Sequence, residues 1–227
     1  FREFLISQAR GENFLLPLEQ FPQAIELTND WHAALNQMRD LTTKDEIERV
    51  GLVGYNLERR GIYLPKEKIV SIPWSFERLK HVPHIAIEVQ QSMAKTKDIK
   101  GFVGVLHSHP PHMSRPRLSA GDLHIALTSG YGPLIGVAAN DINSFAFRTR
   151  ESTTPSNSQP EFYDIWEGEP RLPELDIKIS EQYKLALYRG DKNGNLQRTY
   201  PYTDKPQAVS KEKAQEMGLF NEKEAAE

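Results

Sequence analysis

The chain contains no cysteine among its 227 residues. Disulfide bonds are therefore excluded, and so are zinc sites built from thiolates. The sequence also lacks any apolar run long enough to cross a bilayer, so no membrane association is expected. An absence of cysteine fits a reducing compartment, and we expect a cytoplasmic protein.

An excess of basic residues is missing as well. Lysine and arginine together number 28 against 31 aspartates and glutamates, which gives a formal net charge of -3. This balance argues against general affinity for nucleic acid, which requires a strongly basic face. With 38% hydrophobic and 26% charged residues, the composition is that of an ordinary globular chain that can bury a sizeable core.

The most informative segment that is present is His107-Ser108-His109-Pro110. It follows the short apolar run 101–106, which predicts a buried strand. In an extended chain, residues two apart point to the same side, so His107 and His109 should project together while Ser108 faces away. Pro110 then ends the strand, because it has no amide hydrogen to donate.

A carboxylate completes this pattern. Ser119 is a good helix N-cap, and Asp122 falls in the first turn of the helix predicted for 122–129. Folding of the intervening loop could present Asp122 to the histidine pair. His107, His109 and Asp122 would then form a three-ligand site for one zinc ion per chain, with water in the fourth position, which is the catalytic zinc pattern.

A water nucleophile also needs a general base, and Glu48 is the upstream candidate. It stands at the start of 48–54, a predicted strand with two glycines that would allow close packing beside the histidine strand. A carboxylate at this place could take a proton from the attacking water.

Each motif has an ordinary structural interpretation when it is taken alone. Surface histidine pairs are common, and Ser119-x-x-Asp122 is also a plain capping box. Glu48 lies in the charged stretch 44–49, which is typical of a solvated surface. The occurrence of all three motifs in this order, with a strand before and a helix after, is what favours a zinc site.

The combined pattern resembles the JAMM motif of the JAB/MPN metalloproteases, a family that includes deubiquitinases and prokaryotic relatives. The matching segments are Glu48-x-x-Gly51-Leu52, His107-Ser108-His109-Pro110 and Ser119-x-x-Asp122. The resemblance implies zinc on His107, His109 and Asp122, with Glu48 as general acid and base. It also implies that Ser119 hydrogen-bonds the oxyanion or the water at the metal.

The resemblance further implies an α/β fold of the JAB/MPN type, similar to cytidine deaminases, with a mixed β-sheet flanked by helices. On this basis we expect a catalytic domain over 1–150, a linker or loop over 151–170, and a C-terminal hairpin and helix extension over 171–227 packed on that domain. The implied reaction is hydrolysis of the peptide or isopeptide bond after the C-terminal tail of ubiquitin or a ubiquitin-like protein. A separate partner protein could activate the enzyme.

Two other classes of function stay open at this point. One is a non-catalytic scaffold or binding module of the same fold, and the other is a zinc hydrolase of small amides. The eight-residue loop between Pro110 and Ser119 is longer than is usual in the family. It contains Arg115 and Arg117, which we expect to contact the substrate.

Hydrophobic periodicity and turn signals predict the remaining elements. Strands are expected over 13–18, 50–56, 61–64, 68–72, 133–139 and 144–148. A hairpin is expected from 177–189 and 196–202, around the turn at 191–195. Helices are expected over 28–38, over 83–93 and over the charged C-terminal segment 210–227.

Overall fold

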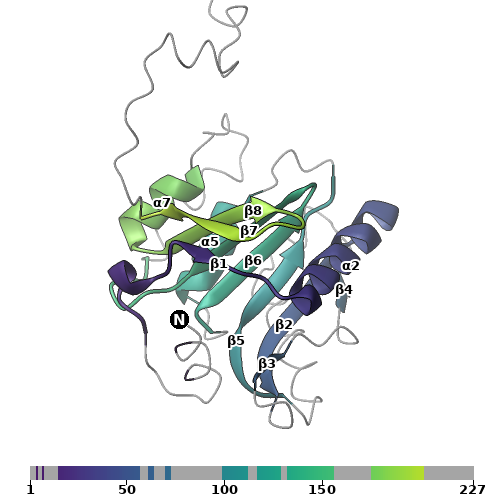
Figure 1. Ribbon diagram of the computed structural model, residues 1–227. Helices are drawn as coiled ribbons and strands as arrows, with labels where there is room; N and C mark the ends of the chain where they lie inside the picture. Colours follow the sequence, from purple (N-terminus) through teal and green to yellow (C-terminus); the bar gives the residue numbers. More distant parts are fainter. Residues whose placement is uncertain are drawn as a thin grey trace, which may run out of the picture.

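The computed structural model describes residues 4, 7, 15–56, 61–63, 70–72, 99–111, 117–128, 132–155 and 175–201. Figure 1 shows the arrangement of its helices and strands. The strands are β1 (Ala24–Ile25), β2 (Glu48–Asn56), β3 (Gly61–Tyr63), β4 (Val70–Ile72), β5 (Ile99–Ser108), β6 (Leu134–Ala139), β7 (Ile142–Phe147), β8 (Ala186–Asp191) and β9 (Leu196–Tyr200). The helices are η1 (Leu18–Gln20), α2 (Asn29–Asp45), α5 (Ala120–Thr128) and α7 (Leu175–Tyr183).

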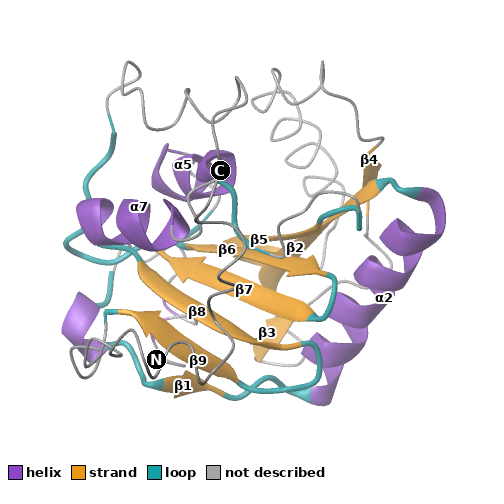
Figure 2. Cartoon of the chain, turned by 90° about the horizontal axis from the view of Figure 1, so that it is seen from above, coloured by secondary structure: helices purple, strands orange, loops and turns teal. Residues whose placement is uncertain are grey.

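All nine described strands belong to one mixed sheet. The strand order is β1-β9-β8-β7-β6-β5-β2-β3, and β4 pairs with β2 beside this path. β5 and β6 run parallel, whereas the other described pairs are antiparallel. The predicted mixed α/β class is therefore confirmed, and the helices lie around the sheet as seen in Figure 2.

The alternation of side chains along β6 shows that both faces of the sheet are buried. Leu134 and Ala138 belong to one hydrophobic cluster, while Ile135 and Val137 belong to another. Because successive strand residues point to opposite faces, these two clusters lie on opposite sides of the sheet. Helix α2 contributes to the first cluster, and α5 and α7 contribute to the second.

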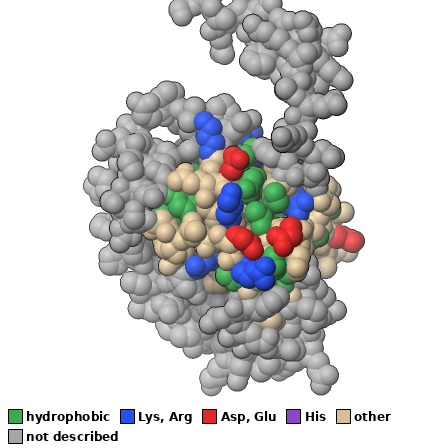
Figure 3. All heavy atoms as spheres, turned by 90° about the vertical axis from the view of Figure 1, so that its left-hand side faces the viewer, with side chains coloured by type: hydrophobic (Ala, Val, Ile, Leu, Met, Phe, Trp, Pro, Cys, Tyr) green, Lys and Arg blue, Asp and Glu red, His purple; other side chains and the backbone are tan. Residues whose placement is uncertain are grey.

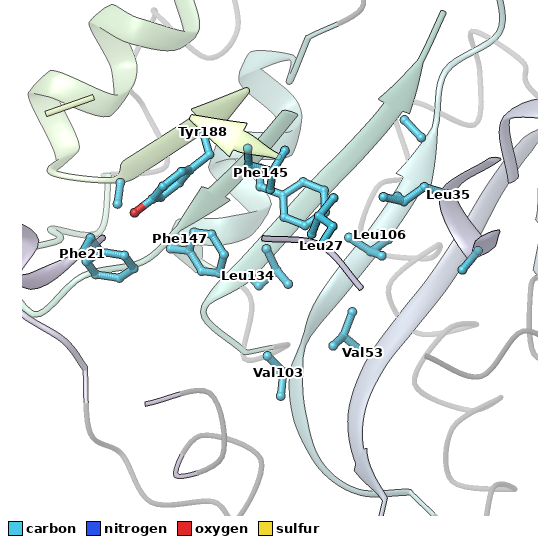
Figure 4. Packing of buried hydrophobic residues seen from close by; sticks show 14 of the residues in the cluster. Phe21, Leu27, Leu35, Val53, Val103, Leu106, Leu134, Phe145, Phe147 and Tyr188 are labelled. Carbon is cyan, nitrogen blue, oxygen red and sulfur yellow. The ribbon is translucent and has the colours of Figure 1, made fainter. Parts of the chain in front are cut away.

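The cluster under α2 is rich in large side chains that are almost completely buried (Figure 4). Leu35 of α2 and Leu106 of β5 are both 0% exposed, and Phe145 of β7 is 1% exposed. Burial of one such side chain contributes about 1.5–3 kcal/mol. This cluster therefore fixes α2 firmly against the centre of the sheet.

Two glycines allow β5 and β6 to approach at their parallel junction. A Cβ atom on Gly104 would collide with the backbone of Leu134, and one on Gly136 would lie 2.5 Å from Leu106 Cδ2. Since Gly104 pairs with Leu134 and Gly136 pairs with Leu106, both collisions lie across the same strand pair. Gly104 requires glycine because a side chain there would push the two strands apart, whereas a Cβ on Gly136 would displace the side chains of Leu106 and Phe145.

The helix predicted over 28–38 is confirmed, and it continues to Asp45. Thr28 occupies the N-cap position, but its side chain makes no capping hydrogen bond. The C-cap residue is Glu46, which adopts the left-handed conformation with φ 57° and donates its amide to the Thr42 carbonyl at 2.8 Å. This compact ending leads directly into β2.

The early strand predicted over 13–18 is wrong for the described residues from 15 onward. Leu18 begins the short helix η1 instead of continuing a strand. The Leu18 amide donates a hydrogen bond to the Glu151 carboxylate at 2.8 Å, and the Arg150 amide donates one to the Leu16 carbonyl at 3.0 Å. The apolar stretch is therefore held by the 150–151 turn, and Pro17 adds no amide donor for strand pairing.

The hairpin predicted from residue 177 is wrong in its first half. Residues 175–183 form α7, and β8 begins only at Ala186. The isoleucines at 177 and 179 imitate a strand pattern of period two, whereas the buried residues follow helical spacing. These buried residues are Asp176, Ile179, Ser180 and Tyr183. Two of the four are polar, which hides the helical period.

The remaining strand predictions agree with the structure to within a few residues. β2, β3 and β4 fall within or close to the predicted ranges, and β7 begins slightly earlier than predicted, at Ile142. β8 pairs with β7 and β9 pairs with β1, so the hairpin 186–200 is an integral part of the sheet. The helices predicted over 83–93 and 210–227 lie outside the described residues.

Figure 3 shows that acidic and basic side chains are interspersed on the face that it presents, with hydrophobic side chains between them. The described residues on this face therefore form no patch of a single charge sign. Among the described segments, none of the helices combines the length and the apolar character that a bilayer crossing needs.

Candidate metal centre

His107 in β5 and His109 directly after it both lie on the side of the sheet that faces α5. Leu106 belongs to the cluster under α2, so strand alternation turns His107 to the opposite face, Ser108 back toward α2, and His109 again to the face of His107. Both imidazoles are buried, with 4% and 9% exposure for His107 and His109. The backbone amide of His109 donates to the Ala138 carbonyl at 3.3 Å and extends the connection to β6.

Glu48 comes from β2, the antiparallel neighbour of β5. The strand begins at Glu48 rather than at Val50, and Val50 is paired with His107. Residues two apart share a face, so Glu48 lies on the same side as Val50 and therefore as His107. Its side chain retains 16% exposure. The carboxylate thus stands beside the imidazoles with limited access to solvent.

Asp122 comes from the first turn of α5 and is held there by Ser119. The Ser119 amide and hydroxyl both donate to Asp122 Oδ2, at 2.6 and 2.8 Å, and Ser119 Oγ accepts from the Asp122 amide at 3.1 Å. This is a reciprocal capping box, with aspartate in the place of the usual glutamate. The other carboxylate oxygen, Oδ1, faces His107.

The ligand atoms are separated by distances that suit a metal ion. His107 Nε2 lies 3.0 Å from His109 Nε2 and 3.0 Å from Asp122 Oδ1, and His109 Nε2 lies 3.6 Å from Asp122 Oδ2. Zinc bonds of about 2.0–2.1 Å in tetrahedral geometry place ligand atoms about 3.3 Å apart. These separations fit the donor set of a small divalent cation.

Glu48 forms a second possible donor group with the two histidines. His107 Nε2 lies 3.9 Å from Glu48 Oε1. Glu48, His107 and His109 each offer a ligand atom within 4.8 Å of the others, so these three residues could hold a metal ion. The carboxylate predicted as a general base is therefore also close enough to serve as a ligand.

The four groups influence one another strongly because they share a buried volume. Burial alone would lower the pKa of His107, but the Asp122 carboxylate outweighs it and raises that pKa to about 9. Burial would raise the pKa of Asp122, yet the charge and hydrogen bond of His107 hold it well below its usual value. Burial raises the pKa of Glu48 against the opposing effect of both histidines. The cluster thus combines compensating charges in a poorly solvated place.

The backbone of Gly136 on β6 also contributes to the raised pKa of His107. Nε2 of the His107 ring faces His109 and Asp122.

The structure brings most of the predicted site residues together, but it does not describe all of them. It brings together Glu48, His107, His109, Ser119 and Asp122 from β2, β5 and the start of α5. Arg115 lies outside the described residues, and Arg117 is half-buried just before the capping box. Substrate contact by these two arginines stays a prediction.

Two hydroxyl groups behind the histidine strand were not anticipated from the sequence. Ser108 Oγ lies 2.5 Å from Thr42 Oγ1, and both residues are almost fully buried. The alternation of β5 indicates that Ser108 faces away from the histidines. No sequence pattern predicts that Thr42 of α2 is its partner, because the contact between the two hydroxyls depends on how the helix packs on the sheet.

The chain was compared with protein-family models, with curated proteins and with solved structures. None of the three comparisons finds a match.

Proposed function

We propose that this protein is a zinc-dependent amide hydrolase of the JAMM type, with the JAB/MPN fold that its motifs resemble. The observation that carries the proposal is the convergence of two imidazoles and two carboxylates from three separate elements at distances of 3.0–3.9 Å. Buried charges are unfavourable unless they are paired or bind metal. A cluster of this composition is better explained by a cation site than by the needs of folding.

In this proposal His107, His109 and Asp122 hold the zinc ion. Zinc in an open three-ligand site polarises a carbonyl and lowers the pKa of water toward about 7. Ser119 holds Asp122 Oδ2 through its amide and hydroxyl, which directs Oδ1 toward His107. This capping contact positions the Asp122 carboxylate before the metal arrives.

Glu48 moves the protons of the reaction. Its carboxylate accepts a proton from the attacking water and later returns it to the nitrogen of the leaving amine, so that an amide and water become a carboxylate and an amine. Its place beside His107, with limited solvent access, suits this exchange. The Ser119 hydroxyl donates to the developing oxyanion, which requires it to turn away from Asp122; such a donor contributes about 2–4 kcal/mol to the transition state.

The proposed substrate is the peptide or isopeptide bond that follows the C-terminal tail of ubiquitin or a ubiquitin-like protein. The JAMM resemblance supports this substrate. An extended tail could add to an exposed strand edge near the site, where main-chain hydrogen bonds would set its register.

The decisive experiment compares Glu48→Gln with Glu46→Gln in the zinc-loaded chain, with ubiquitin-like fusions and small amides as substrates. Glu46 is an exposed glutamate two residues away and serves as the matched control. We expect Glu48→Gln to retain zinc and to lose about 10²–10⁴-fold in kcat, while Glu46→Gln behaves like the wild type.

Each other outcome redirects the proposal. Zinc loss in Glu48→Gln would make Glu48 a ligand rather than the base. Zinc binding without cleavage of any amide would favour a scaffold, and cleavage of small amides alone would remove the ubiquitin-like substrate. No zinc uptake by the wild-type chain would refute the site.

A further inference from the structure

A chain of buried hydroxyl groups lies on the reverse side of the histidine strand. Ser108 and Thr42 are 0% and 1% exposed. Ser108 Oγ accepts from the Arg49 amide at 3.0 Å, and Thr42 Oγ1 donates to the Ile47 carbonyl at 2.9 Å. The single hydrogen of Thr42 is used there, so across the 2.5 Å contact the Ser108 hydroxyl must donate to Thr42.

This chain of hydrogen bonds connects three elements of the structure, and each group donates to the next one. The Arg49 amide donates to Ser108, Ser108 donates to Thr42, and Thr42 donates to the Ile47 carbonyl. Arg49 belongs to β2, Ser108 to β5 and Thr42 to α2. The first donor belongs to Arg49 and the last acceptor belongs to Ile47. These two residues flank Glu48 in the sequence.

The backbone around Glu48 needs this support. Residue pairing between β2 and β5 reaches Val50 and His107, and Glu48 lies two residues beyond that point. On its other side Glu48 is paired with Ile72 of the short strand β4. On the side of β5, the contact of the Arg49 amide with Ser108 Oγ takes the place of a backbone ladder bond.

The Arg49 side chain does not replace the hydroxyl chain. Its guanidinium donates to the Ile47 carbonyl at 2.5 Å and to Asp45 Oδ2 at 2.6 Å. Both contacts join Arg49 to residues just before it, at the end of α2. Neither connects Glu48 to β5, which carries the two histidines.

We propose that Ser108 and Thr42 are positioning residues that hold the Glu48 carboxylate against the histidine pair. The segment His107-Ser108-His109 thereby has a role on both faces of the sheet. The two imidazoles lie on one face beside the carboxylates, and the Ser108 hydroxyl on the opposite face holds Glu48 in position. The consequence for catalysis rests on the proposed function, whereas the fixing of the β2 start does not.

The test uses Thr42→Val, which keeps the side-chain shape but removes the hydroxyl, and Thr42→Ser, which keeps the hydroxyl. Ser108→Ala removes the middle of the chain. Ser180→Ala is the control, because Ser180 is equally buried and its Oγ has no hydrogen-bond partner among the described residues. All variants are made in the full chain, and their folding is checked by circular dichroism.

The first measurement is hydrogen exchange at the Arg49 amide, compared with amides in the centre of β6. We expect exchange at Arg49 to accelerate about tenfold or more in Thr42→Val and Ser108→Ala, since the amide loses a firmly held acceptor. β6 should be unaffected. Thr42→Ser and Ser180→Ala should retain the wild-type rate. An unchanged Arg49 rate in both hydroxyl-deleting variants would overturn the proposal, whatever the outcome with substrates.

The second measurement separates positioning from general structure. In the zinc-loaded protein we expect kcat to fall about 10–100-fold in Thr42→Val and Ser108→Ala, because misplacement of a catalytic group by about 1 Å has an effect of this size. KM and zinc affinity should stay within about twofold, and Thr42→Ser should restore kcat. A loss no larger than in Ser180→Ala, or no rescue by Thr42→Ser, would overturn the proposal.

A failure of the proposed function can be recognised separately. If the wild-type chain cleaves no amide, the carbon-13 signal of the Glu48 carboxyl replaces kcat as the readout, assigned by its disappearance in Glu48→Gln. We expect zinc to shift this signal in the wild type and in Thr42→Ser, and to shift it less in Thr42→Val. Equal shifts in Thr42→Val and the wild type would overturn the proposal.

Discussion

The two sides of the sheet differ in chemistry, although they share the same strands. The side under α2 holds large apolar residues such as Leu35 and Phe145, together with hydroxyl groups that are paired to backbone atoms. The side under α5 has a hydrophobic cluster of its own, but it also holds a group of ionisable side chains, among them His107 and Asp122. This contrast teaches that strand alternation can confine the groups that bind a ligand to one face of a sheet whose two faces both stabilise the fold.

The separation has an energetic reason. Several titratable groups buried together have few partners other than each other or a cation, and they contribute little net stability. The apolar clusters on the two faces supply the stability instead, through Leu35, Leu106 and their neighbours under α2 and through the residues under α5 and α7 that lie away from the ionisable groups. If this division is real, variants on the two sides should affect different measurements.

The largest effect is expected from His109→Ala. Replacement of residues that merely support a ligand weakens metal binding about 10–100-fold, so removal of a ligand should weaken zinc binding by more than about 100-fold. Without zinc, stability should change less than in a core variant, because His107 still pairs with Asp122 at 3.0 Å. Isothermal titration and metal analysis measure the first effect. His32→Ala on α2 is the control, and equal zinc loss in both variants would contradict the assignment.

Leu35→Ala should show the reverse behaviour. Leu35 is fully buried between α2 and the sheet. Its truncation should lower the free energy of unfolding by about 2–5 kcal/mol, measured by urea denaturation. Zinc affinity of the folded protein should stay within about threefold. The exposed Asp40→Ala on the same helix should change stability by less than about 0.5 kcal/mol. A tenfold loss of zinc affinity in Leu35→Ala would show that the two sides are coupled.

A smaller effect is expected at Tyr188, also on the α2 side. Burial raises the pKa of its phenol above the usual value, and the hydroxyl donates to the Pro22 carbonyl at 2.6 Å. The native state therefore keeps the proton at a pH where the unfolded chain releases it. This stability is fully present below about pH 10, the ordinary value, and is lost as the pH rises further.

Tyr188→Phe tests this pH dependence. At neutral pH the loss of the hydrogen bond should lower stability by about 1 kcal/mol. Between pH 9 and about 11 the variant should lose less stability than the wild type, as measured by urea denaturation at each pH. Parallel pH curves for the two proteins would contradict the expected shift.

Local patterns were sufficient for much of the candidate site. Period-two alternation and the apolar run before the histidines predicted the strand that carries His107 and His109. The N-cap signal predicted that Asp122 would lie in the first turn of a helix. Glu48 was predicted from the two glycines of its strand, and the pairing of Val50 with His107 places that strand next to β5.

Other features depend on contacts that leave no local pattern. The meeting of Thr42 with Ser108 depends on the packing of α2 on the sheet. The helix α7 was mistaken for a strand because Asp176 and Ser180 occupy buried positions. Asp176 is paired with Arg189 of β8, a long-range contact that allows a charge to be buried there.

The glycines at the junction of β5 and β6 also restrict how this chain can change in length. A Cβ atom on Gly104 would collide with the backbone of the facing strand, and one on Gly136 would collide with the side chains of Leu106 and Phe145. A single residue inserted between Leu106 and His107 would keep this junction but reverse the odd–even parity of the residues beyond the insertion. Both imidazoles would then point into the layer under α2, and Ser108 would take their place. Length variation is consequently tolerable beyond His109, in the loop that leads to Ser119, but not before it.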